Sequence, residues 1–135
     1  MTDNRQHIYS ERVEAIRQAI LEAAHDIVLI AQVTVETTGT MLMGSEIGAA
    51  LNALEPMGVD LIGLNCATGP AEMSEHLRYL SKNAKVSLSV MPNAGLPQLG
   101  ANGATYPLQP DELAIALDGF VNDYGISLVG GCCGT

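Results

Sequence analysis

The sequence predicts an α/β fold made of parallel βα units, and three observations support this class. Segments with apolar residues at helical spacing alternate four times with short strand-like runs. These runs are almost continuously apolar, which is typical of strands covered on both faces in a parallel sheet. Glycine, proline or cysteine follows most of the runs and marks a turn. Alternation with short connections favours right-handed βαβ units in one parallel sheet.

The first half of the chain is expected to contain two helix–strand pairs. Val13, Ile16, Ile20 and Ala24 recur on one face of the first helix. Ser45 is a plausible N-cap for the second helix. The predicted elements are a polar leader at 1–9, helices at about 10–25 and 46–54, and strands at 27–35 and 59–65.

The second half is expected to repeat this pattern around a long loop. Pro70 opens a helix whose inner face carries Met73, Leu77 and Leu80. Residues 95–110 contain three glycines and three prolines, which predicts a loop. The remaining predicted elements are strands at 86–91 and 126–129 and a helix at 111–124 that Gly125 stops.

The length of 135 residues indicates one domain with a real core. Four βα units are compatible with two architectures. One is a small doubly wound sheet, and the other is half of a (β/α)8 TIM-type barrel, which typically takes about 250 residues. Periodicity alone does not separate the two.

The composition argues against two classes of partner. The net charge is −9, and no cluster of Lys and Arg is present to neutralise nucleic-acid phosphates or bind an anionic membrane. No apolar run reaches the roughly 18 residues needed to span a bilayer. The polar start from Met1 to His7 lacks a secretory apolar region, so we expect a cytoplasmic protein.

The three cysteines are the most informative residues of the chain. Cys66 follows one strand-like run, and Cys132 and Cys133 follow another. Because parallel strands end at one edge of their sheet, the fold would bring the three thiols together. An odd number, with two cysteines adjacent, fits a disulfide framework poorly. Three thiolates instead match a zinc site with one position left open.

A zinc ion held by three thiolates carries a net charge of about −1, which weakens its ability to activate water. Such a site suits a soft incoming ligand, because a substrate thiol that binds zinc loses its proton and becomes a nucleophile at neutral pH. The chemistry predicted for the site is attack by such a thiolate on a methyl donor.

A simpler interpretation of the cysteines is that they are small buried hydrophobes. Their restriction to strand ends with neighbouring glycines favours the metal site. His7, His25 and His76 lie in the leader or on predicted helices and are not expected to be ligands. Glu36 and Asp60 flank strands, where solvated or turn roles are expected.

Three motifs resemble the homocysteine S-methyltransferase family. They are Gly63–Pro70 (GLNCATGP), Met91–Gly95 (MPNAG) and Gly130–Thr135 (GGCCGT). Within the family, Val33–Gly39 and Tyr106–Leu108 favour the homocysteine-binding module of the cobalamin-dependent branch over betaine-dependent relatives. The resemblance runs from about Ile30 to Thr135.

The resemblance implies that the chain is the second half of a (β/α)8 barrel, a partial homocysteine-binding domain over 1–135. It implies Zn²⁺ ligation by Cys66, Cys132 and Cys133, and a role for Asn93 in holding the amino-acid end of homocysteine. The implied reaction is methyl transfer to homocysteine to give methionine. Methylcobalamin, recharged from methyltetrahydrofolate, would supply the methyl group from modules outside this chain.

The first four barrel strands have no counterpart in this sequence. The family has a motif on its fourth strand, Glu-Thr followed shortly by Asp, and the segment from Met1 to Glu36 contains no match to it. Two alternatives follow. One is a truncated, non-catalytic zinc-binding or scaffold module, and the other is a relative that uses S-methylmethionine or betaine. A half barrel leaves two open edges and an apolar inner face, so we expect self-association or a partner that supplies the missing half.

Overall fold

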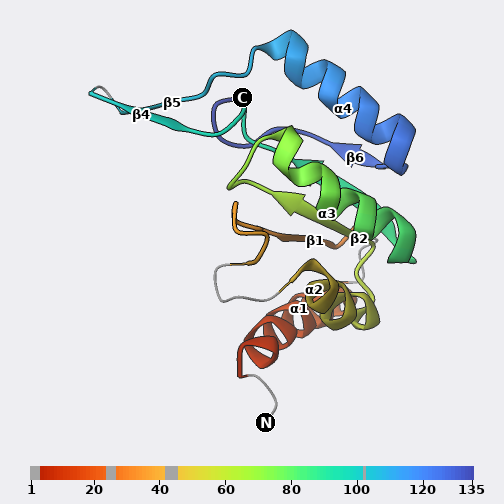
Figure 1. The fold of residues 1–135 in the computed structure, drawn as a ribbon. Coiled ribbons are helices and arrows are strands. Elements are labelled where there is room, and N and C mark those ends of the chain that lie inside the picture. Colours follow the sequence, from red (N-terminus) through yellow and green to blue (C-terminus); the bar gives the residue numbers. More distant parts are fainter. Residues whose placement is uncertain (1–3, 24–26, 42–45, 102) are drawn as a thin grey trace.

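The computed structural model describes residues 4–23, 27–41, 46–101 and 103–135, with side chains from residue 11 onward. A four-stranded parallel sheet and its helices form the body, and a two-stranded antiparallel hairpin projects from it (Figure 1). The helices are α1 (Asn4–Ala23), α2 (Ile47–Leu54), η1 (Glu55–Met57), α3 (Pro70–Asn83) and α4 (Pro110–Tyr124). The strands are β1 (Ile30–Val33), β2 (Leu61–Asn65), β3 (Ser87–Met91), β4 (Gln98–Gly100), β5 (Gly103–Thr105) and β6 (Leu128–Val129).

The strand order identifies the architecture. The main sheet runs β1-β2-β3-β6, and every neighbouring pair is parallel. The helices follow the same order, because α2 packs on α3 and α3 packs on α4 (Figure 1). A doubly wound sheet would reverse its strand order at a switch point, and this sheet does not. The chain therefore has the topology of half a (β/α)8 barrel, as the family resemblance implies.

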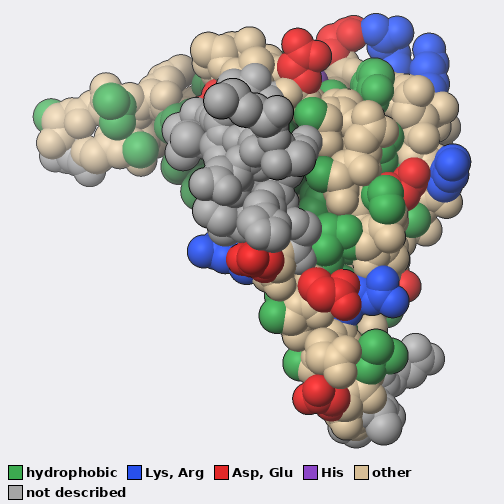
Figure 2. Space-filling model, turned by 90° about the horizontal axis from the view of Figure 1, so that it is seen from below, with side chains coloured by type: hydrophobic (Ala, Val, Ile, Leu, Met, Phe, Trp, Pro, Cys, Tyr) green, Lys and Arg blue, Asp and Glu red, His purple; other side chains and the backbone are tan. Residues whose placement is uncertain are grey.

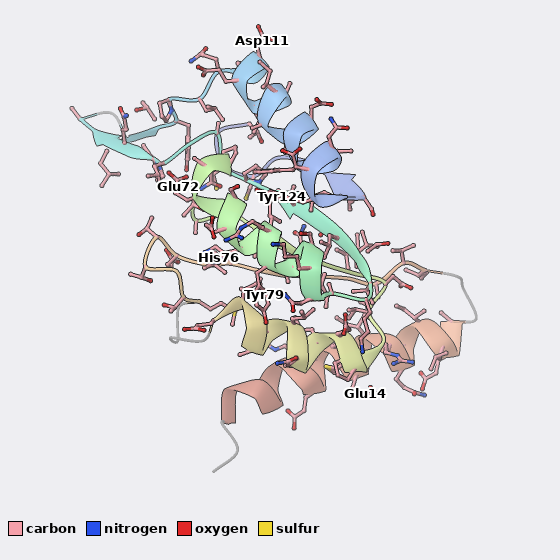
Figure 3. All side chains as sticks on the ribbon, turned by 45° about the vertical axis from the view of Figure 1, so that its right-hand side comes forward. Glu14, Glu72, His76, Tyr79, Asp111 and Tyr124 are labelled. Atoms are coloured by element: carbon pink, nitrogen blue, oxygen red, sulfur yellow. The ribbon has the colours of Figure 1, made fainter. Side chains whose placement is uncertain are left out.

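Two helices begin with the same local device. Pro70 and Pro110 occupy the first turns of α3 and α4, where a missing N–H carries little penalty. Glu72 accepts a hydrogen bond from the Gly69 amide at 3.1 Å, and Glu112 accepts one from the Gln109 amide at 2.9 Å. Figure 3 labels Glu72 at the start of α3. These carboxylates fix the first turns of both helices.

The core lies between the sheet and its helices. Alternate residues of β2 and β3 point toward the helices and are almost fully buried there. Helices α2 and α3 cover them with the side chains of one face each. The central residues of this core are Ile62, Leu64, Leu88 and Val90 from the sheet and Ile47, Leu51, Met73, Leu77 and Leu80 from the helices.

The opposite face of the sheet, which would face the interior of a complete barrel, is partly polar. Gln32 Nε2 donates a hydrogen bond to Ser89 Oγ at 3.2 Å. This bond passes over Gly63 of β2, which is the strand partner of Gln32 on one side and of Ser89 on the other. Thr34 Oγ1 donates to Asn65 Oδ1 at 3.0 Å. The expectation of an apolar inner face is therefore wrong, because side chains from neighbouring strands pair through hydrogen bonds there.

Several predicted boundaries differ from the structure. Helix α1 begins at Asn4, so most of the segment predicted as a polar leader belongs to the helix. The predicted N-cap Ser45 lies outside the described residues. Strand β1 is shorter than the predicted 27–35, because the Leu29 amide donates to the Asp60 carboxylate at 2.7 Å in place of a strand partner.

The predicted loop at 95–110 contains the β4–β5 hairpin. Its turn is bounded by Gly100 and Gly103, and Gly103 adopts a φ of 108°, which favours glycine. Leu99 at the hairpin is 90% exposed. Figure 2 shows this arm extending from the body with hydrophobic and uncharged side chains. None of the helices in the described ranges is long and apolar enough to cross a membrane.

Candidate metal centre

The three cysteines converge at the carboxyl edge of the sheet. Cys66 follows β2, and Cys132 and Cys133 follow β6. The sulfur of Cys133 lies 3.8 Å from that of Cys66 and 3.9 Å from that of Cys132. All three sulfurs lie within 4.8 Å of one another. The fold thus brings together thiols separated by more than sixty residues.

The sulfur spacing fits a tetrahedral zinc ion. With Zn–S bonds of about 2.3 Å, tetrahedral geometry places two sulfur ligands about 3.8 Å apart. Two of the sulfur pairs already have this separation. The three thiols are partly accessible, and Cys133 is the most exposed. The donor set therefore fits Zn²⁺ with three protein ligands and a fourth position on the open side.

A strained turn orients Cys66. Cys66 and Ala67 both adopt left-handed conformations, with φ of 57° and 60°. The Cys66 amide donates to the Met91 carbonyl at 3.0 Å, and the Thr68 amide donates to the Cys66 carbonyl at 2.7 Å. Left-handed non-glycine residues persist where the surrounding structure holds them, often at functional sites. The turn directs the Cys66 thiol toward the end of β6.

The loop after β6 is held by the segment that follows β3. The Cys132 amide donates to the Pro92 carbonyl at 2.9 Å, and the Ala94 amide donates to the Cys133 carbonyl at 2.9 Å. Thr135 Oγ1 donates to the Cys132 carbonyl at 2.7 Å and closes the turn. The paired cysteines are thus fixed by backbone contacts on both sides.

Asn93, the predicted substrate-binding residue, lies between the cysteine loops. Its side chain is buried, and its Oδ1 accepts a hydrogen bond from the Cys133 amide at 3.1 Å. The same side chain lies beside the Cys66 thiol and contributes to lowering its pKa. In this structure, Asn93 therefore connects both parts of the centre.

The pKa values of Cys66 and Cys132 are shifted in opposite directions. The hydrogen bond from the Ala67 amide, followed by those from Cys132, Cys133 and Asn93, lowers the pKa of Cys66 despite its partial burial. Burial, reinforced by the neighbouring thiols, raises the pKa of Cys132 to about 11. Like charges at these separations oppose one another, so three thiolates together require a cation.

The other candidate residues lie elsewhere. His76 is on α3, in the helix layer (Figure 3), and the cluster that could hold a metal within the described residues does not include it. The His7 side chain and His25 lie outside what the structure describes. Asp60 accepts the Leu29 amide, which is the turn role expected of it. Glu36 is exposed, and its amide donates to the Thr40 carbonyl.

Tyr106 is the residue whose place at this centre the sequence did not reveal. The neighbouring Cys133 side chain raises the pKa of Tyr106. Its ring packs against Gly134. The available signal was an aromatic residue directly before Pro107 in a glycine-rich segment, but nothing in that pattern indicated which loop it would contact.

Comparison of the sequence with known proteins gives close relatives. The chain is 72% identical over 119 residues to methionine synthase of Mycobacterium leprae and 71% identical over 119 residues to methionine synthase of Mycobacterium tuberculosis. Each match covers 88% of this chain and 10% of the relative. The chain therefore spans about a tenth of the length of these proteins.

Solved structures share the fold. The homocysteine methyltransferase MmuM from Escherichia coli, in its metallated form, superposes with a TM-score of 0.63 at 21% identity, covering 91% of this chain and 36% of that protein. Its oxidised form gives a TM-score of 0.62 at 20% identity, with coverages of 93% and 38%. The profile described as homocysteine S-methyltransferase matches residues 8–135. The chain belongs to the homocysteine S-methyltransferase family.

Proposed function

We propose that this chain forms part of a zinc-dependent homocysteine S-methyltransferase of the methionine synthase type. In this proposal Cys66, Cys132 and Cys133 bind Zn²⁺, and the open side of the centre receives the homocysteine sulfur. The observation that carries the proposal is the convergence of three sulfurs at the spacing of a tetrahedral zinc site. The high identity to two mycobacterial methionine synthases supports the choice of type.

The proposed reaction transfers a methyl group to sulfur. An S–CH₃ bond forms at the homocysteine thiolate, and the bond between the methyl carbon and the donor breaks, with its electron pair left on the donor. Zinc, when bound, would lower the pKa of the substrate thiol and so supply thiolate at neutral pH. The protein's part is to hold the three ligands and to position the incoming sulfur.

Asn93 is the proposed contact for the amino-acid end of homocysteine. Its support is its place, because its buried side chain adjoins both Cys66 and Cys133. Because its Oδ1 already accepts the Cys133 amide, any contact with substrate would involve the remaining hydrogen-bonding capacity of the amide. Replacement by alanine should raise the KM for homocysteine in an enzyme that still contains zinc.

The methyl donor would be bound outside these 135 residues. Cobalamin and methyltetrahydrofolate are the donors implied by the resemblance to the cobalamin-dependent branch. The relatives are about ten times longer than the matched segment, which leaves ample chain for donor-binding parts. This donor assignment is part of the proposal.

The first experiment measures zinc in the purified, reduced chain and in Cys132→Ala. One zinc per chain, lost in the variant, is the expected result. Ser127→Ala is the matched control, because Ser127 is an exposed small polar residue just before β6 and should leave the zinc content unchanged. A wild-type chain without zinc, with three freely titratable thiols, would contradict the proposal.

Zinc binding alone does not separate an enzyme part from a module without turnover. The second measurement is therefore methionine formation from homocysteine by the full-length protein that contains this segment, with methylcobalamin as donor. Activity that disappears with Cys132→Ala, while Ser127→Ala retains it, supports the enzymatic proposal. A zinc-loaded full-length protein without turnover supports the scaffold alternative.

A further inference from the structure

The ring of Tyr106 occupies the space beside Gly134, where any other residue would place its side chain. A Cβ atom added at Gly134 would lie far inside 3.0 Å of ring atoms Cγ and Cδ2 of Tyr106. Gly134 also adopts a φ of 83°, a conformation that favours glycine. Two independent constraints, space and backbone conformation, therefore require glycine directly after the paired cysteines.

The hydroxyl of the same side chain reaches the centre itself. The Cys133 side chain is its neighbour and raises the pKa of Tyr106. Tyr106 is partly buried against this loop. A phenol O–H donates a hydrogen bond, and a metal-bound thiolate accepts one through its sulfur. Ring and hydroxyl together contact two consecutive residues of the turn that carries the ligands.

The backbone next to Tyr106 is tied to the same loop. The Leu108 amide donates to the Ala94 carbonyl at 3.0 Å, and the Ala94 amide donates to the Cys133 carbonyl at 2.9 Å. The chain that leaves the β4–β5 hairpin is thus anchored beside the cysteines, on the side where the C-terminus lies (Figure 1). This anchoring holds the Tyr106 side chain over the turn.

We propose that Tyr106 is a positioning residue of the metal centre, whose ring fixes the turn at Gly134 and whose hydroxyl donates a hydrogen bond to the Cys133 thiolate. The inference rests on the proposed zinc site. Groups that hydrogen-bond to metal ligands fix ligand orientation and tune the metal, and their loss typically costs about 10–100-fold in metal affinity or activity. The structure assigns this task to a residue from the segment between β3 and α4.

The test measures zinc affinity by competition with a chromophoric chelator, together with the absorption spectrum of the Co²⁺-substituted protein. Tyr106→Phe removes the hydroxyl and keeps the ring, so we expect zinc affinity to fall about tenfold and the sulfur-to-cobalt charge-transfer band to shift. Gly134→Ala displaces the ring and should weaken zinc binding at least as much. Tyr124→Phe is the control, because its hydroxyl bonds to Ser74 between α4 and α3, away from the cysteines (Figure 3).

The outcomes separate the two proposals. A wild-type chain that binds one zinc, with Tyr106→Phe equal to it in affinity and in cobalt spectrum, would overturn the role of Tyr106 and leave the zinc site intact. A wild-type chain that binds no zinc would overturn the zinc site, and the role of Tyr106 with it. Thermal unfolding followed by circular dichroism verifies that each variant is folded. If Gly134→Ala does not fold, Tyr106→Phe alone tests the role of Tyr106.

Discussion

The side-chain oxygen of Asn93 accepts a hydrogen bond from the backbone amide of Cys133 at 3.1 Å, across 40 residues of sequence. Asn93 follows β3, and Cys133 follows β6, so this bond joins the ends of two neighbouring strands. Asn93 is only 2% exposed. A buried amide side chain therefore fixes how the two loops of the centre meet.

Replacing Asn93 by alanine leaves the Cys133 amide without this partner. We expect the free energy of unfolding of the reduced, zinc-free chain to fall by about 1 kcal/mol, the usual net contribution of a hydrogen bond, because this bond is only partly buried. Urea unfolding followed by circular dichroism measures this. Asn122→Ala is the control, because its side chain bonds to Asp118 on the exposed surface of α4 and should cost less than about 0.5 kcal/mol. An equal loss of unfolding free energy in the two variants would show that the Asn93 bond stabilises the chain no more than a surface bond does.

The sequence was sufficient for the fold class and for the convergence of the cysteines. The βα alternation predicts parallel strands, and parallel strands end at one edge of their sheet, so the convergence of Cys66 and Cys132 could be predicted. The positions of Tyr106 and Gly134 were not predictable, because they depend on where a long segment folds back. The left-handed turn at Cys66 and Ala67 was equally hidden, since neither residue type favours that conformation.

Ala67 offers a direct test of that turn. Glycine adopts a φ of 60° without the steric penalty of a Cβ atom, which is about 1–2 kcal/mol for other residues. We expect Ala67→Gly to leave the free energy of unfolding unchanged or to raise it by up to about 1 kcal/mol. Ala114→Gly, at an exposed site within α4, should instead lower it by about 1 kcal/mol. Parallel urea titrations compare the two, and similar losses in both would argue against strain at Ala67.

Gly63 lies in the middle of β2, where the Gln32–Ser89 hydrogen bond passes over it. A Cβ atom there would overlap the backbone oxygen and the Oγ of Ser89. We therefore expect Gly63→Ala to lower the free energy of unfolding by about 1–3 kcal/mol or more, as overpacking does. Gly119→Ala is the opposite case, because a Cβ atom there meets no neighbour and alanine favours the helix by about 1 kcal/mol. Thermal melts should show a lower melting temperature for Gly63→Ala and a higher one for Gly119→Ala. An unchanged melting temperature for Gly63→Ala would mean that the inner face can rearrange.

Zinc affinity should depend steeply on pH. The pKa of Cys132, raised to about 11, keeps this thiol protonated at pH 7, so its proton must leave when zinc binds. Because zinc binding releases this proton, lowering the pH weakens binding. Each released proton lowers the zinc affinity about tenfold for every pH unit below the pKa of its thiol. Chelator competition between pH 6.5 and 7.5, corrected for protonation of the chelator, should give at least this tenfold change. An affinity independent of pH would show that the thiols do not bind as thiolates.

The open edges of the sheet predict self-association of the isolated chain. Within the described residues, β1 pairs only with β2 and β6 pairs only with β3, so each presents an unpaired edge. Unpaired edges template pairing with another chain, and two half barrels together hold the eight strands of a closed one. Sedimentation should give a mass above the 14.2 kDa of one chain. Ile30→Lys, on β1 at 38% exposure, should shift the chain toward monomer, whereas Leu99→Lys, at 90% exposure on the hairpin, should not. A wild-type chain that remains monomeric at high concentration would show that the polar pairs of the inner face are enough to keep the half barrel separate.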